Sequence, residues 1–277
     1  MTVDNAAVAL AWPCEALAAA LRPALPGLQV QAVASVASTN TRLIERLRAD
    51  PTTPVLLVAE AQTAGRGRSG RSWQSAPGAS LTFSLGLRYA PVDWSGLSLA
   101  IGVALADAIE PAAAGKAPRL QLKWPNDLWL ADGADRWRKL GGILVETVAA
   151  GGGRACVVGI GLNVRPLATA ADLSSGYACL QELEPALDAP GLLQRVALPL
   201  VHALRRFECE GLSPFAAAYA RRDLLQGRRV TTTLDGAPEG LAEGVDAQGA
   251  LRLRHDGGVA RVTSGEVSVR PSAAVGA

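Results

Sequence analysis

Apolar and polar residues follow two distinct periodicities along most of the chain, one typical of strands and one typical of helices. Residues 28–37 and 81–88 alternate between apolar and polar positions, which is typical of strands with one buried face. Residues 55–60 are apolar almost throughout and therefore indicate a strand buried on both faces. Three more strands are predicted at 119–124, 143–149 and 155–163, the last two separated by a turn of three glycines.

Helical periodicity fills most of the segments between these strands. Leu43, Ile44 and Leu47 fall on one face of a segment that begins at Ser38-Thr39-Asn40, and any of these three polar residues can be the N-cap. Residues 166–190 are irregular and polar, as expected of a surface segment. Further helices are predicted at 13–22, 95–113, 191–211 and 213–224.

The pattern changes from Gly227 onward. The tail consists of short apolar stretches separated by Asp-Gly and Gln-Gly turns. Short strands at this spacing are typical of a small β-barrel. We therefore expect two domains, residues 1–225 and residues 226–277.

Composition narrows the classes of protein that remain. The 277 residues carry 27 Lys and Arg against 25 Asp and Glu, a net charge of +2, which argues against a general nucleic-acid coat. With 19% charged residues and a mean hydropathy of +0.19, the chain is not expected to be disordered. No run approaches the roughly 18–20 unbroken apolar residues of a membrane helix. No basic residue precedes Arg22, so a secretory signal is not expected and the predicted location is cytoplasmic.

Cysteine and histidine are too sparse to carry most kinds of enzyme chemistry. The four cysteines form no CxxC pair, so we expect reduced, buried or inert thiols rather than a zinc site or disulfides. The two histidines lie in a helix-like and a strand-like stretch, where we expect structural or surface roles. Reactive groups are therefore expected among Arg, Lys, Asn, Asp and the backbone. The residues concerned are Cys14, Cys156, Cys179, Cys209, His202 and His255.

A glycine- and arginine-rich loop, GRGRSGRSWQS, occupies residues 65–75. Arg66, Arg68 and Arg71 can surround an anion with several charges, and the glycines let backbone N–H groups approach it. The alternative is a solvated surface loop. The loop also contains a formal GxGxxG, but the residues after it do not open a helix, so we do not expect a dinucleotide fold.

A second candidate constellation is LQLKWPNDLWL, residues 120–130. Pro125 ends the strand because it lacks an N–H, and Asn126-Asp127 is predicted as a turn at the strand end. That turn can be a plain hairpin. Alternatively, Lys123, Asn126 and Asp127 project from one edge and hold phosphate and magnesium.

Two further segments add candidates. In RKLGGILVET, Lys139 precedes a Gly-Gly pair and a buried strand, where a solvated lysine is also common. In VVGIGLNV, Gly159 and Gly161 permit close approach of another group to the strand or mark a bulge. Asn163 can donate or accept a hydrogen bond there.

Taken together, five ordered motifs resemble those of biotin–protein ligases, the family of biotin–[acetyl-CoA-carboxylase] ligase and holocarboxylase synthetase. The resemblance spans about residues 36–164 and resumes in the tail. It implies an α+β catalytic domain with a mixed, largely antiparallel sheet and a small C-terminal SH3-like β-barrel. The motifs are Ser38-Thr39-Asn40, GRGRSGRSW, KWPND, KLGGILVE and GIGLN.

The resemblance also implies a reaction in two steps. The carboxylate of biotin attacks the α-phosphate of ATP, giving biotinyl-5′-AMP and pyrophosphate. A lysine of a biotin carboxyl carrier domain then attacks this mixed anhydride. ATP and biotin are the implied substrates, Mg²⁺ the implied ion, and the carrier protein of a biotin-dependent carboxylase the implied partner. Bringing a carboxylate against a polyphosphate demands fixed cations.

Residue roles follow from the matched motif positions. The implied catalytic residues are Arg68, Lys139 and Lys123. The biotin-binding set is Ser38, Thr39, Asn40, Gln62, Gly65, Arg66, Gly67, Arg68 and Lys139. The nucleotide-binding set is Arg71, Trp73, Asn126, Asp127 and Asn163, with Asp127 also as the magnesium ligand.

Some features depart from the family. Only about 37 residues precede Ser38 and they do not read as a three-helix domain, so a monofunctional ligase without DNA binding is expected. Residues 128–138 are longer than the family pattern, although the LGGILVE that follows favours Lys139 over Arg138. The alternatives are a lipoate–protein ligase, which has a different Arg-Gly segment, and a non-catalytic biotin sensor. A homodimer through edge strands is possible.

Overall fold

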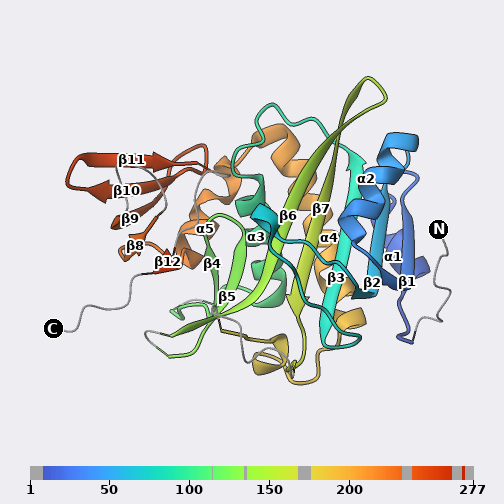
Figure 1. Ribbon diagram of the computed structural model, residues 1–277, viewed down its shortest axis with the longest axis horizontal. Helices are drawn as coiled ribbons and strands as arrows, with labels where there is room; N and C mark the ends of the chain where they lie inside the picture. The colour runs from blue at the N-terminus through green and yellow to red at the C-terminus, as the bar shows by residue number, and fades with distance from the viewer. Residues whose placement is uncertain are drawn as a thin grey trace.

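A computed structural model describes residues 9–113, 115–133, 136–167, 176–232, 239–263 and 270–271. The larger part is a seven-stranded sheet in the order β1-β2-β3-β7-β6-β5-β4 (Figure 1). Of its neighbouring pairs, β1 and β2 run parallel and the others antiparallel, so the predicted mixed, largely antiparallel sheet is confirmed. The strands are β1 (Gln29–Val36), β2 (Val55–Gln62), β3 (Ser80–Arg88), β4 (Leu120–Lys123), β5 (Asp127–Ala131), β6 (Trp137–Ala150) and β7 (Gly153–Asn163).

Helices cover both faces of this sheet (Figure 1). Leu43 and Leu47 of α2 are buried against Val55 and Leu57 on one face. The opposite face is covered by α1, α3 and α4, whose apolar residues join the main core. Nearly every residue of α3 is apolar because α3 lies between the sheet and α4. The helices are α1 (Cys14–Leu21), α2 (Thr39–Ala49), α3 (Leu97–Ile109), α4 (Ala189–Glu210) and α5 (Ala216–Arg222).

Most predicted elements are present, and the differences have local causes. The helix predicted at 95–113 begins after Gly96 and ends at Ile109, two residues before Pro111. The strand predicted at 143–149 begins at Trp137 instead, because the Gly-Gly pair continues the sheet rather than interrupting it. Asn126-Asp127 lies at a turn as predicted, but a strand that was not predicted, β5, starts at once with Asp127.

The tail forms a second, smaller sheet. It is antiparallel, with the order β11-β10-β9-β8-β12, which agrees with the small C-terminal β-domain expected. The division at 225/226 stays a prediction. The strands are β8 (Arg229–Thr231), β9 (Glu239–Val245), β10 (Leu251–His255), β11 (Gly258–Val262) and β12 (Arg270–Pro271).

The tail is joined to the larger part through buried contacts. The indole Nε1 of Trp124 donates to the carbonyl of Gly249 at 2.9 Å, and both groups are buried. A Cβ on Gly249, whose φ is +78°, would lie 2.9 Å from Gly96 Cα, so only glycine fits this turn. Leu251 and Leu253 of β10 belong to the same core as α3 and α4. The tail therefore packs directly behind the KWPND segment.

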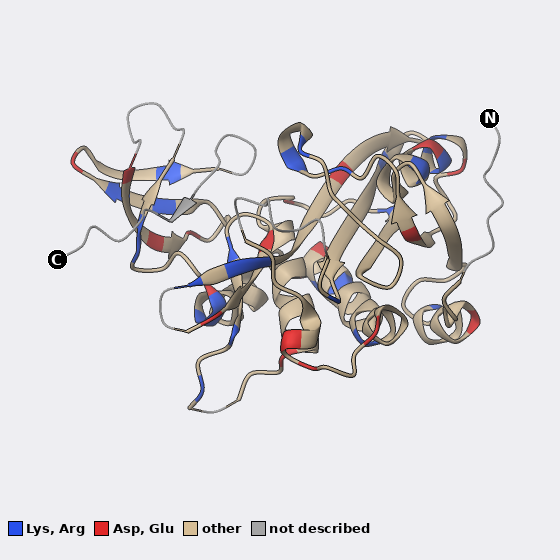
Figure 2. Ribbon diagram, turned by 60° about the horizontal axis from the view of Figure 1, so that its bottom comes forward, with Lys and Arg blue, Asp and Glu red and all other residues tan. Residues whose placement is uncertain are grey.

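Basic and acidic residues are interspersed along both parts of the ribbon (Figure 2). Among the described residues, no helix is both long enough and apolar enough to span a bilayer.

Candidate active site

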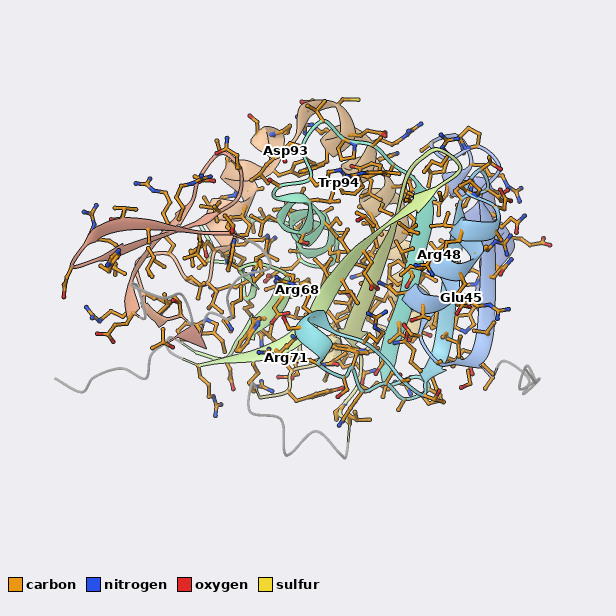
Figure 3. All side chains as sticks on the ribbon, turned by 45° about the horizontal axis from the view of Figure 1, so that its top comes forward. Glu45, Arg48, Arg68, Arg71, Asp93 and Trp94 are labelled. Carbon is orange, nitrogen blue, oxygen red and sulfur yellow. The ribbon has the colours of Figure 1, made fainter. Side chains whose placement is uncertain are left out.

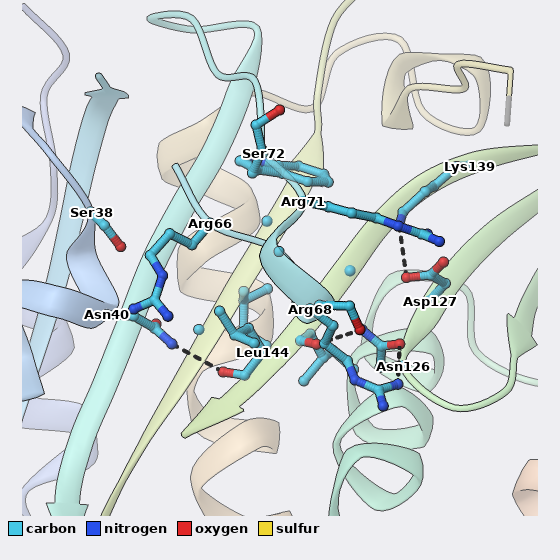
Figure 4. A pocket seen from close by; sticks show the side chains of 18 of the residues that line it. Ser38, Asn40, Arg66, Arg68, Arg71, Ser72, Asn126, Asp127, Lys139 and Leu144 are labelled. Atoms are coloured by element: carbon cyan, nitrogen blue, oxygen red, sulfur yellow. Dashed lines mark hydrogen bonds and ion pairs between the residues drawn. The ribbon is translucent and has the colours of Figure 1, made fainter. Parts of the chain in front are cut away.

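One cavity of about 170 Å³ lies on the face of the large sheet that carries α2. Its walls come from the N-terminus of α2, the glycine-rich segment, the KWPND turn and the middle of β6 and β7 (Figure 4). The predicted site residues that line it are Ser38, Thr39, Asn40, Gln62, Arg66, Gly67, Arg68, Arg71, Trp73, Lys123, Asn126, Asp127 and Lys139.

The glycine-rich segment is a hairpin rather than an open loop. Arg66 and Ser72 form an antiparallel bridge, and Trp73 N donates to Gly65 O at 2.9 Å. Its apex is a turn of 3₁₀ helix (Arg68–Gly70). Gly65 does not line the cavity. A Cβ there would lie 2.3 Å from Trp73 O, so this glycine is needed to close the neck of the hairpin.

Two arginines tie the hairpin to the rest of the site. At the apex, Arg68 Nη1 donates to Asn126 Oδ1 at 3.1 Å. At the neck, Arg66 Nη2 lies 3.1 Å from a carboxylate oxygen of Glu146. Burial lowers the pKa of Arg68, an effect that the negative charge of Asp127 opposes. Figure 3 shows Arg68 and Arg71 together at the hairpin, beside β5 and β6. The hairpin is thus held over the cavity by cationic side chains.

The KWPND turn presents polar groups to the same cavity. Asn126 is fixed to β6, since its Nδ2 donates to Ile143 O at 2.8 Å and Ile143 N donates to Asn126 O at 2.9 Å. Lys139 Nζ lies 2.8 Å from Asp127 Oδ1. Lys123 is buried, with Nζ 4.8 Å from the ring centroid of Trp129.

The donor set around Asp127 bears on the implied magnesium ion. Among the described residues, no group of three His, Cys, Asp or Glu side chains could hold a metal. Mg²⁺ in nucleotide sites is often held by one or two carboxylates, with phosphate and water oxygens completing the coordination. Asp127 fits the role of a single protein ligand beside a polyphosphate.

The N-terminus of α2 carries a buried polar network. Ser38 is the N-cap, its Oγ accepting from Thr41 N at 3.4 Å, which decides between the three candidates. Thr39 N donates to Gln62 Oε1 at 2.8 Å. The Ser84 hydroxyl lies 2.6 Å from both Thr39 Oγ1 and Asn40 Oδ1. These hydrogen bonds fix the polar groups at the start of α2 relative to β2 and β3.

Two glycines of β7 explain how closely the walls pack. A Cβ on Gly159 would lie 2.2 Å from Asn40 Oδ1. A Cβ on Gly161 would lie 2.5 Å from the indole of Trp73. The prediction that these glycines permit close approach is therefore confirmed. The Nε1 of Trp73 is buried and has no hydrogen-bond partner among the described residues.

Asn163 is not among the residues that line the cavity, although it was predicted to bind nucleotide. Its Nδ2 donates to Ala178 O at 2.9 Å and to Lys139 O at 3.3 Å. In this structure Asn163 therefore fixes the backbone of β6 at Lys139 rather than facing the cavity.

Sequence reasoning missed two polar residues beside the cavity, Ser84 and Glu146. In the sequence Ser84 looks like an ordinary polar position of the alternating strand at 81–88. Glu146 is in phase with Gly142 and Leu144 of β6, both of which line the cavity. This alternation could have indicated that Glu146 lies beside the cavity. Using it requires knowing which face of β6 meets α2.

Comparison with known proteins supplies the family. The model described as Biotin/lipoate A/B protein ligase family matches residues 32–163, and the one described as Biotin protein ligase C terminal domain matches residues 226–270. Bifunctional ligase/repressor BirA of Salmonella typhimurium is 38% identical over 238 residues, covering 84% of this chain and 72% of that protein. Biotin--[acetyl-CoA-carboxylase] ligase of Mycobacterium tuberculosis is 36% identical over 257 residues, covering 86% and 88%.

The fold comparison agrees with the sequence comparison. The structure of a biotin protein ligase from Aquifex aeolicus in complex with biotin and ATP superposes with a TM-score of 0.72 at 26% identity. It covers 88% of this chain and 99% of that one. The fold and these matches place the chain among ligases of the biotin/lipoate class. Within this class the chain belongs to the biotin protein ligase family.

Proposed function

We propose that this chain joins biotin to a lysine of a biotin carboxyl carrier domain, using ATP. A carboxylate oxygen of biotin attacks the α-phosphorus of ATP, pyrophosphate leaves, and biotinyl-5′-AMP forms. The amine of the carrier lysine then attacks the acyl carbon, AMP leaves, and the amide forms with loss of a proton. One observation carries the proposal: among the described residues lining the cavity, five are cationic, facing one carboxylate. The cations are Arg66, Arg68, Arg71, Lys123 and Lys139.

The neutral end of the cavity suits the ureido ring of biotin, which carries one acceptor and two donors. Ser38 can donate its hydroxyl hydrogen, because its Oγ serves the helix only as an acceptor. Gln62 uses its Oε1 within the protein, so its amide hydrogens are the groups it offers. Asn40 is 3% exposed, and both the oxygen and the nitrogen of its amide are hydrogen-bonded within the protein. Asn40 therefore acts by positioning its neighbours.

The cationic end suits the reacting carboxylate and phosphate. Arg68 at the hairpin apex and Lys139 on β6 both reach the end of the cavity lined by Asn126 and Asp127 (Figure 4). Fixed charges of this kind stabilise negative charge that develops on the α-phosphate during attack. Arg71 and Lys123 add to this field. Asp127 would hold Mg²⁺, which neutralises phosphate charge when bound.

The hairpin has a second role in the proposal. An acyl-adenylate hydrolyses if water reaches it, so the site must stay covered until the carrier lysine arrives. The Arg68–Asn126 hydrogen bond holds the apex over the cavity. Replacement of Arg68 by Ala is therefore expected to release biotinyl-AMP into solution.

The decisive experiment is biotin-dependent exchange of labelled pyrophosphate into ATP by the purified chain with Mg²⁺. Lipoate and octanoate are assayed in parallel. Exchange with biotin alone supports the proposal, and transfer to a purified carrier domain completes it. Exchange with lipoate or octanoate instead would assign the chain to lipoate ligation. Biotin binding by calorimetry without exchange would favour a non-catalytic sensor.

A further inference from the structure

Glu146 is a carboxylate beside a cavity proposed to take two anionic substrates. Its side chain is 21% exposed. One oxygen lies 3.1 Å from Arg66 Nη2, and the other accepts from Asn40 Nδ2 at 2.9 Å. Repulsion between Glu146 and an anionic substrate weakens substrate binding unless other contacts of Glu146 compensate for it.

The first contact of Glu146 reaches the neck of the glycine-rich hairpin. Arg66 forms the bridge with Ser72 that closes this neck, and its Nη1 donates to Thr41 Oγ1 at 3.4 Å. Its guanidinium is half-exposed, so these contacts decide the direction in which it points. Figure 4 shows the Arg66 guanidinium directly beside Asn40.

The second contact reaches the N-terminus of α2. Asn40 Nδ2 bonds both to Glu146 and to Leu144 O, at 3.2 Å for the latter. Its Oδ1 meets Ser84, and the amide packs on Gly159 with no room for a Cβ between them. The orientation of this amide therefore depends on Glu146 as well as on the close packing.

We propose that Glu146 is a positioning residue for biotin, joining the hairpin to α2 through one carboxylate. It holds the Arg66 guanidinium over the N-terminus of α2 and fixes Asn40 beside it, so that both groups keep their places at the ureido end of the cavity. This inference rests on the proposed function, since it takes the cavity to be the biotin site. Glu146 itself touches neither substrate nor intermediate.

The direction in which Glu146→Gln changes the affinity for biotin distinguishes a positioning role from simple charge repulsion. If Glu146 acted on substrates mainly through its charge, Glu146→Gln would remove repulsion and tighten biotin binding. If it positions Arg66, the same change weakens biotin binding, because an amide holds a guanidinium less well than a carboxylate does. Gln still offers an oxygen to Asn40, so the fold is preserved.

The experiment measures pyrophosphate exchange and the release of biotinyl-AMP for the wild type and Glu146→Gln. The matched control is Glu45→Gln, at an exposed carboxylate on α2 away from Arg68 and Arg71 (Figure 3). We expect Glu146→Gln to raise the KM for biotin about fivefold, as suits an ion pair whose arginine is half-exposed, with kcat within about twofold. Release of biotinyl-AMP rises by a similar factor. The control changes neither.

A double-mutant cycle with Arg66→Met tests the mechanism directly. If Glu146 acts through Arg66, Glu146→Gln adds little to the effect of Arg66→Met on the KM. Additive effects, or an unchanged or lowered KM in Glu146→Gln alone, overturn the inference. Wild-type exchange with biotin is measured first. Its absence would refute the proposed function, whereas normal wild-type exchange with an inert Glu146→Gln would refute this inference alone.

Discussion

Arg222, the last residue of α5, offers a sharp test of how the KWPND strand is held in place. Its side chain is 2% exposed. Its Nε donates to Asp107 Oδ1 at 2.9 Å, its Nη1 to Leu120 O at 2.8 Å, and its Nη2 to Glu110 O. The guanidinium thus joins α3 and α5 to the edge strand β4.

Replacing Arg222 by Met keeps most of the side-chain volume and removes all of these donors. Two backbone carbonyls, of Leu120 and Glu110, lose a partner, and each buried unsatisfied acceptor costs about 1–3 kcal/mol. The carboxylate of Asp107 is 40% exposed and can be hydrated once Arg222 is gone, so the loss of this ion pair adds little to the loss of stability. We expect the free energy of unfolding to fall by about 3 kcal/mol, the scale of a broken buried ion pair. At about 2–4 °C per kcal/mol, the Tm falls by about 6–12 °C.

The assay is urea unfolding followed by circular dichroism, with a thermal melt alongside. The control is Arg229→Met, because the ion pair of Arg229 with Glu239 is 3.5 Å long and 64% exposed on both sides. Such a pair contributes about 0–1 kcal/mol. If Arg222→Met is no less stable than the control variant, the hydrogen bonds assigned to Arg222 do not support the strand.

Three further predictions concern other parts of the molecule. Gly159→Ala places a methyl group on Asn40 and should raise the KM for biotin roughly tenfold in the exchange assay; an unchanged KM would contradict the packing described. Burial raises the pKa of Asp223 to about 6 from its ordinary 3.8, so the folded state holds the proton longer than the unfolded state. The free energy of unfolding should therefore decline by about 2 kcal/mol as pH rises from 4 to 6, a decline that urea titrations should find reduced in Asp223→Asn. Finally, burial raises the pKa of Cys156, whereas Cys209 is exposed, so a thiol reagent should label Cys209 first by peptide mapping.

The sequence predicted best what local patterns control. The apolar face of α2, the buried strand β2 and the turn between β6 and β7 follow from periodicity and glycine placement within a few residues. The glycine-rich segment and the KWPND turn stand out as candidate sites by their residue types alone.

What escaped prediction depends on contacts between distant segments. Asn163 lies in a matched motif, yet its amide is used by the backbone at residues 139 and 178. Glu146 sits seven positions after Lys139, and the alternation of β6 alone does not tell which face of the strand meets α2. Its importance comes from Arg66 and Asn40, which are 80 and 106 positions away in the chain. Pairings over such distances are set by sheet register, which a single sequence does not reveal.

The hydrogen bond between Trp124 and Gly249 has a consequence for dividing the protein into fragments. A cut between residues 225 and 226 would separate a buried indole N–H from its acceptor and expose the apolar side chains of Leu251 and Leu253. The two fragments would then carry complementary surfaces that regain their partners only when the halves meet. Because Trp124 directly precedes the turn that carries Asn126 and Asp127, reassembly of the halves would also rebuild one wall of the cavity. Ligase activity could then serve as the readout for reunion of the two fragments.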